Sequence, residues 1–301
     1  MTEKDLKNKT LILVVGVHKS ATTSFYEYLS HQNKVFIPTI KELHFFTPLI
    51  YNPNKKIDIK KYLSFFKNTD KEFLLDVSPS YLYGKNVIIN EINKYFKKIK
   101  IVLLLRDPTE RFVSFYKQGI KTGKINKETS LLDYFFECRE EHKNYLEKRQ
   151  CKNNFINRGL REGCYSLYIK DWIEHFKENI QIIFFEDFIK NPNKIMNQFG
   201  KEYNLSFDNI SLGVSNESRK PRSQKIGELK SKIFRKYESF FRSNKKLKIL
   251  LKRIYELINT EPLEKNIFFY EKKEISKFYS SYNLELKKIL KFSSKQIDKW
   301  K

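Results

Sequence analysis

Residues Gly16 to Ser24 combine a lysine with short hydroxyl side chains, a combination that suits the binding of a phosphate. They follow the apolar run 11–15 and lead into the segment 25–29, so the sequence predicts a buried strand, a turn and the start of a helix. The first turn of a helix favours an anion, because its N–H groups are unpaired and carry partial positive charge. Lys19 would add a full charge, although a strand–turn–helix with a chance lysine is the alternative interpretation. The small and hydroxyl residues of this turn are Ser20, Ala21, Thr22, Thr23 and Ser24.

The common ATP- and GTP-binding motif G-x-x-x-x-G-K-[ST] does not fit this turn. Ala21 stands in place of the second glycine, and Lys19 lies before the hydroxyl cluster. No second strand ends in a clear aspartate in the usual setting for Mg²⁺. The pattern therefore points away from nucleoside triphosphatases and toward another phosphate-containing ligand.

A second candidate anion site follows the apolar run 101–105, which is typical of a strand buried on both faces of a parallel sheet. Arg106 comes at the carboxyl end of that strand, where open α/β sheets bind ligands. Pro108 suits the first position of a helix, with Asp107 as its cap, and Ser114 lies two turns along it. Arg106 and Ser114 could grip one phosphate from two sides. The alternative is an arginine that caps a loop carbonyl and a serine on a solvated face.

Together the two stretches resemble the sulfotransferases that use 3′-phosphoadenosine 5′-phosphosulfate. The pattern Gly16–x–x–Lys19–x–x–Thr–Thr is similar to the family's 5′-phosphosulfate loop, and Arg106–Asp–Pro–x–x–Arg–x–x–Ser114 to its 3′-phosphate motif. The resemblance implies that the helix start at 20–24 holds the 5′ phosphate and that Arg106 and Ser114 hold the 3′ phosphate. Lys19 would neutralise the oxygen that leaves with 3′,5′-adenosine bisphosphate. The scheme requires no metal.

The segment Lys–Glu–Leu–His–Phe–Phe at 41–46 is similar to the Glu-x-His-Phe-Phe segment of heparan sulfate and other Golgi-type carbohydrate sulfotransferases. The resemblance implies that Glu42 is the general base. Independently, an acceptor hydroxyl or amine must lose a proton as it attacks sulfur, and a nearby carboxylate can take it. In an extended segment His44 would share a face with Glu42 and be a rival base or an orienting partner. The alternative for His44 is a hydrogen-bonded core residue, whereas His142 and the other two helical histidines are expected at the surface.

We expect the acceptor to meet residues of the segment 74–81, which matches the family's Ser-Pro-x-Tyr motif, and to meet Lys41. Val77 stands where heparan-type relatives often carry a lysine, a departure that bears on how this region contacts an acceptor. Asp76 and Ser78 are candidate pocket residues, with a cap or turn role as the alternative.

A late basic loop, 216–223, resembles the segment of the family that closes over the nucleotide. Its candidate anion contacts are Arg219, Lys220 and Arg222, although on this composition a solvated basic face is the alternative. The segment 163–176 and the ending 278–300 also resemble the family, so the resemblance runs from Leu11 to Trp300.

The elements that must position these residues alternate between strand and helix. Strands are expected at 11–16, 35–37, 72–76, 101–105 and 180–185, with helical patterns between them. This alternation predicts an α/β fold in which a parallel, P-loop-type sheet carries helices on both faces. No linker divides the chain, so we expect a single domain over 1–301 whose part from about 225 to 301 is mostly helical.

The formal net charge is +24, which raises nucleic-acid binding as a competing function. The basic residues are spread along the chain without a nucleic-acid motif, so that partner is not expected. The three cysteines and the lack of a long apolar run predict neither a disulfide framework nor a membrane span. A cytoplasmic, bacterial enzyme is expected, or alternatively an excised catalytic domain of a Golgi-type enzyme.

The predicted function is sulfuryl transfer from 3′-phosphoadenosine 5′-phosphosulfate to a hydroxyl or amine of a carbohydrate. Two alternatives stay open at this point. One is transfer to a small alcohol, a phenol or a lipid, and the other is a non-catalytic protein that binds nucleotides or nucleic acid.

Overall fold

A computed structural model describes residues 7–67, 69–148, 154–207, 219–221, 258–262, 268–291 and 294–300, with single positions between 223 and 255. The chain divides into two compact units. The first comprises Met1–Asp107, Cys164–Val214 and Ser281–Trp300, and the second comprises Pro108–Gly163 and Ser215–Ser280. That the whole chain acts as a single domain stays a prediction.

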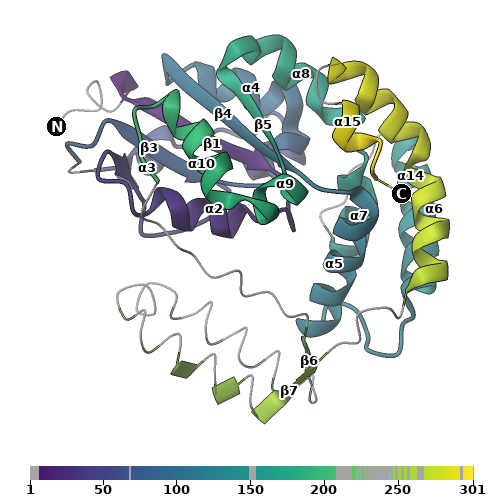
Figure 1. The fold of residues 1–301 in the computed structure, drawn as a ribbon. Coiled ribbons are helices and arrows are strands. Elements are labelled where there is room, and N and C mark those ends of the chain that lie inside the picture. Colours follow the sequence, from purple (N-terminus) through teal and green to yellow (C-terminus); the bar gives the residue numbers. More distant parts are fainter. Residues whose placement is uncertain are drawn as a thin grey trace. The chain divides into compact units, whose positions relative to one another are not determined.

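The first unit is built on five parallel strands in the order β2-β3-β1-β4-β5 (Figure 1). The strands are β1 (Thr10–Gly16), β2 (Val35–Phe36), β3 (Phe73–Val77), β4 (Lys98–Leu105) and β5 (Ile180–Phe184). All five predicted strands are confirmed, and each consists mainly of apolar residues, as expected for a parallel sheet with helices on both faces. Strand β4 starts three residues earlier than predicted, since its first residues alternate lysine with isoleucine at the edge of the buried region.

Helices cover both faces of this sheet, as predicted. Even-numbered residues of β1 pack against α2 (Thr22–Leu29), α9 (Phe185–Lys190) and α10 (Pro192–Lys201). Odd-numbered residues of β1 share the other face with α3 (Ile59–Ser64), α4 (Lys85–Asn93) and α8 (Ser166–Phe176). Successive side chains of a strand point to opposite faces, so one apolar strand builds both cores. The chain's last part, including α15 (Ser294–Ile297), joins the second face.

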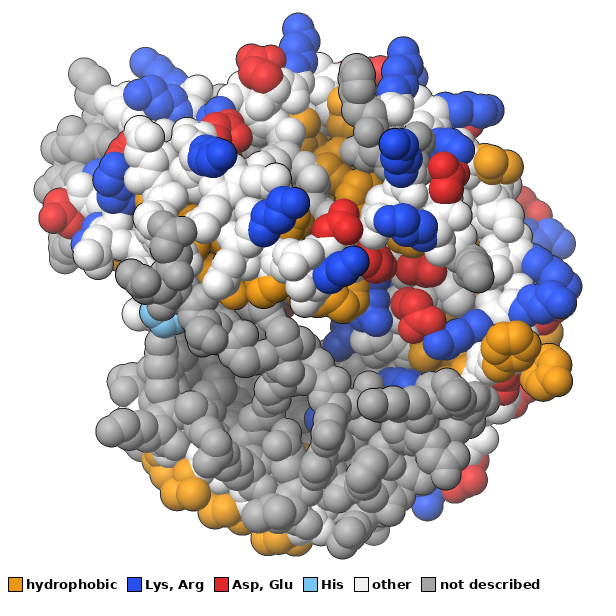
Figure 2. Space-filling model, viewed as in Figure 1, with side chains coloured by type: hydrophobic (Ala, Val, Ile, Leu, Met, Phe, Trp, Pro, Cys, Tyr) orange, Lys and Arg blue, Asp and Glu red, His pale blue; other side chains and the backbone are white. Residues whose placement is uncertain are grey.

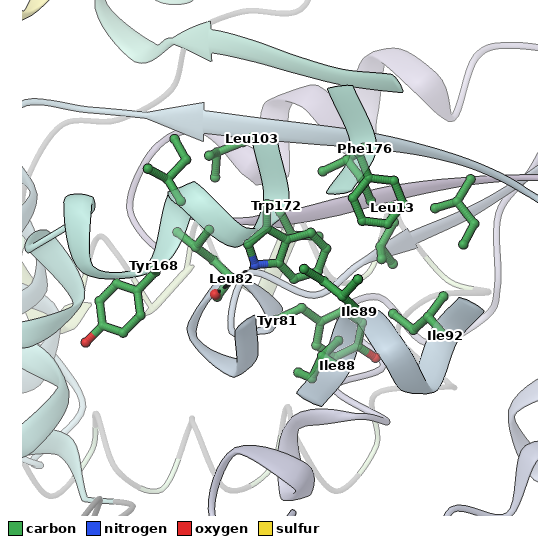
Figure 3. Packing of buried hydrophobic residues seen from close by; sticks show 14 of the residues in the cluster. Leu13, Tyr81, Leu82, Ile88, Ile89, Ile92, Leu103, Tyr168, Trp172 and Phe176 are labelled. Atoms are coloured by element: carbon green, nitrogen blue, oxygen red, sulfur yellow. Dashed lines mark hydrogen bonds between the residues drawn. The ribbon is translucent and has the colours of Figure 1, made fainter. Parts of the chain in front are cut away.

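Trp172 of α8 anchors this second face. Its indole is fully buried, and its N–H donates to the carbonyl oxygen of Leu82 at 3.0 Å. Figure 3 shows the ring among Leu82, Ile89 and Phe176. A buried tryptophan that also satisfies a buried carbonyl fixes both the packing and the orientation of its helix.

The second unit is mainly helical in its described part. It holds α5 (Pro108–Lys121), α6 (Leu131–Lys148), α7 (Phe155–Gly159) and the first part of α14 (Phe269–Ile289). Arg111 is fully buried and lies 3.7 Å from the Glu162 carboxylate. His142 is buried rather than at the surface as expected, because Phe278 of α14 covers it.

The remaining described elements are short. Strands β6 (Arg219–Pro221) and β7 (Thr260–Pro262) pair antiparallel. The 3-10 turns occupy Thr47–Ile50, Tyr81–Gly84, Arg161–Gly163 and Lys177–Asn179.

Lysine and arginine side chains are scattered over the described surface drawn in Figure 2, with acidic side chains between them. On that face they do not gather into the single stripe that a nucleic-acid groove shows. Among the described residues, no helix has the length and the apolar content needed to cross a lipid bilayer.

Candidate active site

The turn between β1 and α2 has the geometry of an anion cradle. Helix α2 begins at Thr22, and its N-cap residue Ala21 makes no side-chain capping bond. The backbone is left-handed at Lys19 and Ala21, with φ of 74° and 61°. The first bond of the helix runs from the N–H of Phe25 to the carbonyl of Ala21, at 3.0 Å. The amides of the first turn therefore precede the internal ladder and face the end of the helix, where an anion is favoured.

Ser20 gives this cradle an unusual feature. Its side chain is 0 % exposed, and its Oγ has no hydrogen-bond partner among the described residues. Buried hydroxyls are nearly always hydrogen-bonded, and leaving one unsatisfied costs about 1–3 kcal/mol. A phosphate oxygen at this turn would supply the missing partner, so the residues present fit a phosphate-containing ligand.

Arg106 at the end of β4 lies directly beside the cradle. Its Nη1 donates to the carbonyl oxygen of Lys19 at 2.9 Å, and its guanidinium lies 4.3 Å from the centre of the Phe185 ring. The Tyr165 hydroxyl donates to the Arg106 carbonyl at 2.8 Å. Arg106 thus makes the loop-carbonyl contact of the alternative interpretation, and the carbonyl belongs to the turn between β1 and α2. The two stretches singled out in the sequence meet at one corner of the sheet.

Glu42 and His44 come together on the loop after β2. His44 Nε2 lies 3.4 Å from Glu42 Oε2, and its Nδ1 lies 2.7 Å from the Ser80 hydroxyl. The segment is not extended as assumed, because Glu42 and His44 both have left-handed backbones, with φ of 58° and 49°. The two side chains meet all the same, so each can orient the other. The ring of His18 stacks on that of His44 at 6.0 Å.

Lys41 connects this pair to the cradle. Its Nζ donates to Thr23 Oγ1 at 2.7 Å and lies 3.2 Å from Glu42 Oε1. Thr23 is the second residue of α2, so one ammonium group spans the anion cradle and the candidate base. An ammonium group in this position can contact a bound nucleotide, a bound acceptor or the Glu42 carboxylate.

The carboxylate of Glu42 is held in its ionised form. Burial alone would raise its pKa, but the hydrogen bond from His44 and the charges of Lys41 and His18 outweigh burial and lower the pKa to about 2. At neutral pH Glu42 is therefore an anion that can accept a proton.

Asp76 and Ser78, both expected in the acceptor pocket, are buried at the end of β3. Ser78 donates from its Oγ to Asp76 Oδ1 at 2.6 Å and accepts from the His44 backbone N–H at 2.9 Å. Their hydrogen bonds are therefore made to other parts of the protein, and they support the loop of Glu42.

The remaining candidate residues lie elsewhere. Ser114 is on α5, in the second unit, so its pairing with Arg106 stays a prediction. Arg219 and Lys220 belong to β6, and Arg222 lies outside the described residues. No group of three or more His, Cys, Asp or Glu side chains in the described part of the chain is arranged to hold a metal ion. That catalysis requires no metal stays a prediction.

Sequence reasoning missed several supporting residues. The hydroxyl of Tyr62 donates to Asp76 across 14 positions, and the Phe185 ring covers Arg106 from a different strand end. His18 sits next to Lys19 in the cradle, which is the one signal that could have drawn attention to it. The contacts of Tyr62 and Phe185 are set by the fold and leave no local pattern.

A sequence model of the family described as "Sulfotransferase domain" matches residues 9–248. Among curated relatives, the bifunctional heparan sulfate N-deacetylase/N-sulfotransferase 1 of Xenopus laevis is 27% identical over 185 residues, covering 59% of this chain and 20% of the relative. The heparan sulfate glucosamine 3-O-sulfotransferase 5 of Homo sapiens is 27% identical over 165 residues, covering 54% and 44% respectively. The matched part thus spans less than half the length of either relative.

Among solved structures, a sulfotransferase from Alicyclobacillus acidocaldarius is similar to this chain with a TM-score of 0.52 and 21% sequence identity. The match covers 67% of this chain and 86% of the other. At that identity the likeness concerns the fold, and it agrees with the parallel sheet and its flanking helices described above.

Proposed function

Because the chain belongs to the sulfotransferase family, we propose that it transfers the sulfuryl group of 3′-phosphoadenosine 5′-phosphosulfate to a hydroxyl or amine of a carbohydrate. The observation that carries the proposal is the hydrogen bond from Arg106 to the Lys19 carbonyl, which joins the two turns that we propose to bind anions at one end of the sheet. A nucleotide with phosphates at both its 3′ and 5′ positions is a ligand that two such neighbouring corners suit.

Each corner has its own proposed task. The amides at the start of α2, with the hydroxyls of Ser20, Thr22, Thr23 and Ser24, bind the 5′ phosphate, and the unsatisfied Ser20 Oγ supports this assignment. Arg106 binds the 3′ phosphate together with Ser114. Arg219, Lys220 and Arg222 are proposed to add positive charge over the bound nucleotide.

The reaction is an in-line displacement at sulfur. A bond forms between the acceptor oxygen or nitrogen and sulfur, while the bond from sulfur to the bridging oxygen breaks and its electron pair stays on the 5′ phosphate. Lys19 neutralises the charge that develops on that oxygen, and Glu42 takes the acceptor's proton. Since positioning and charge stabilisation carry most of such a reaction, the chain's own groups suffice for the proposed scheme.

The carbohydrate acceptor is proposed from three supports. The Glu-x-His-Phe-Phe segment at 42–46 resembles that of carbohydrate sulfotransferases, and the names of both curated relatives refer to heparan sulfate. Lys41 lies beside Glu42 and is placed to meet a sulfated or carboxylated sugar.

A cytoplasmic, bacterial location stays a prediction.

The test is transfer of label from ³⁵S-labelled donor to a panel of purified acceptors by the intact protein. We expect labelled product with an amino sugar or an anionic glycan, and calorimetric binding of 3′,5′-adenosine bisphosphate. Label on a phenol, a simple alcohol or a lipid alone would replace the acceptor class. Absence of both transfer and bisphosphate binding would contradict the proposed function.

A further inference from the structure

Asp76 is a buried carboxylate that the proposed reaction does not use, and it lies under the loop that carries Glu42 and His44. Its side chain is 0 % exposed, which leaves an acceptor no surface of it to touch. Its oxygens accept hydrogen bonds from three hydroxyl groups, those of Ser78 at 2.6 Å, Tyr62 at 3.0 Å and Tyr81 at 3.2 Å. Burial raises the pKa of this carboxyl, while the hydroxyl donors favour its ionised form.

The hydroxyl protons have a direction that follows from simple chemistry. A hydroxyl carries one proton, and Ser78 and Tyr81 each donate that proton to an oxygen of Asp76. Their lone pairs then face the backbone of the neighbouring loop. Ser78 Oγ accepts from the N–H of His44 at 2.9 Å, and the Tyr81 hydroxyl accepts from the N–H of Phe46 at 3.3 Å.

The held loop has a backbone that needs such support. Glu42 and His44 have φ of 58° and 49°. For residues with a side chain, this left-handed conformation costs on the order of 1 kcal/mol each, and it persists where surrounding contacts determine it. A second anchor ties the supporting residues to the sheet, because the N–H of Ser78 donates to the carbonyl of Val14 in β1 at 3.0 Å.

We infer that Asp76 is a positioning residue, which acts through Ser78 and Tyr81 to fix the backbone at His44 and Phe46 and so the side chains of Glu42 and His44. Its effect on turnover rests on the proposed function, whereas its hold on the loop does not. The two acceptor oxygens of Asp76 are essential in this arrangement, because an amide in its place would keep only one of them and would offer N–H groups to the hydroxyls on the other side. A hydroxyl that accepts a hydrogen bond from the amide no longer directs its lone pair at the backbone N–H groups of the loop.

The kinetic test uses Asp76→Asn in the full chain. We expect kcat to fall about 100-fold, the usual effect of a misplaced catalytic group. Calorimetric affinity for 3′,5′-adenosine bisphosphate should stay unchanged, since the cradle at 19–24 is not altered. The double variant Asp76→Asn/Ser78→Ala should lose no more activity than the worse single variant, because both act on one hydrogen-bond chain. Independent, multiplying losses, or a variant with the kcat of the parent protein, would overturn the inference.

A second test does not depend on activity. Hydrogen exchange measured by mass spectrometry should be about tenfold faster in Asp76→Asn for a peptide that covers 43–47, as expected when the hydroxyls no longer hold the N–H groups of His44 and Phe46. Tyr81→Phe and Tyr62→Phe form a matched pair, since each removes one hydroxyl from Asp76 but only Tyr81 holds a backbone N–H. Faster exchange at 43–47 is expected for Tyr81→Phe and not for Tyr62→Phe.

The two proposals can fail separately. If the parent protein neither transfers label nor binds the bisphosphate, the proposed function falls, while hydrogen exchange still decides the role of Asp76. If transfer is normal and exchange at 43–47 is unchanged in Asp76→Asn and Tyr81→Phe, only the positioning role falls. If Asp76→Asn exchanges faster in every peptide of the first unit, Asp76 serves general stability and the inference is wrong.

Discussion

At the scale of single residues, Glu42 is the candidate general base and yet has a low pKa, which makes it a weak one. It lies among three positive or potentially positive groups, Lys41, His18 and His44, which hold its pKa at about 2. A carboxylate with so low a pKa is a weak base, and efficient general bases have pKa values nearer the working pH. Because Lys41 also contacts Thr23 in the anion cradle, we expect bound donor to draw the ammonium away from Glu42 and make it more basic.

Glu42→Gln separates the two candidate bases. The amide cannot accept the acceptor's proton, so we expect turnover to fall about 100-fold or more while the bisphosphate binds normally. Steady-state kcat and a calorimetric Kd measure the two effects. His44→Ala should cost less if His44 only orients Glu42. Near-normal turnover in Glu42→Gln would remove it as base and favour His44 in its place.

The pH dependence of the free enzyme tests the charges around Glu42. Its folded pKa is lowered to about 2, so the basic form is lost only as the pH falls through that value. The acidic limb of kcat/KM should therefore lie well below neutral pH. Lys41→Ala removes one of the charges that lower the pKa and should move this limb upward, whereas Lys41→Arg should leave it in place. Coincident profiles for Lys41→Ala and the parent protein would contradict the coupling.

At the residue scale, local sequence patterns predicted the candidate binding and catalytic residues but not the residues that support them. Lys19, Arg106, Glu42 and His44 could be named because their spacing is local and their chemistry specific. The bond from Arg106 to the Lys19 carbonyl was anticipated only as an arginine that caps some loop carbonyl. The prediction that His142 lies at the surface was wrong, because Phe278, which covers it, lies more than a hundred positions away in the sequence.

At the scale of elements, the strands were predictable because helices on both faces of a parallel sheet favour mainly apolar residues along each strand. The start of α5 was equally clear, since Pro108 is its first residue as predicted. The loop 41–46 was not, because left-handed backbone at a glutamate and a histidine is imposed by contacts with the end of β3. Propensity has no signal for a conformation that only tertiary contacts stabilise.

Trp172→Phe tests what orients α8 on the sheet. Phenylalanine keeps most of the apolar contact but removes one of the two N–H donors to the Leu82 carbonyl, which still accepts from the Lys85 N–H, so the protein should be destabilised by about 0.5–1.5 kcal/mol. Denaturant unfolding measures the loss. Trp300→Phe is the matched control, because the Trp300 Nε1 has no hydrogen-bond partner among the described residues. Equal losses for the two variants would show that packing alone accounts for the effect.

At the scale of the whole molecule, the net charge of +24 comes from basic residues spread along the sequence. On the face drawn in Figure 2, basic and acidic side chains alternate. Such a distribution can speed the approach of an anionic donor or glycan without specifying either. The sequence predicted this spread of charge, and it could not identify the acceptor, because acceptor contacts come from variable loops.

Salt dependence distinguishes the proposed ligand from nucleic acid. A protein that contacts six to ten phosphates of a duplex loses about 10³–10⁵ in affinity between 50 and 200 mM salt. The bisphosphate offers only two phosphate groups to fixed partners, so its affinity should fall far less over the same range. Calorimetric titrations at both salt concentrations provide the comparison. A loss as steep as that for duplex DNA would favour a nucleic-acid-binding protein.

The link between Arg106 and the Lys19 carbonyl has a further consequence for ligand discrimination. A guanidinium carries five N–H donors, so Arg106 can meet the proposed 3′ phosphate with some of them while Nη1 keeps its bond to the Lys19 carbonyl. A phosphate held there would also steady the turn that is proposed to grip the 5′ end. Adenosine 5′-phosphate, which lacks the 3′ group, should therefore lose both the direct contact and this support, and bind more weakly than 3′,5′-adenosine bisphosphate.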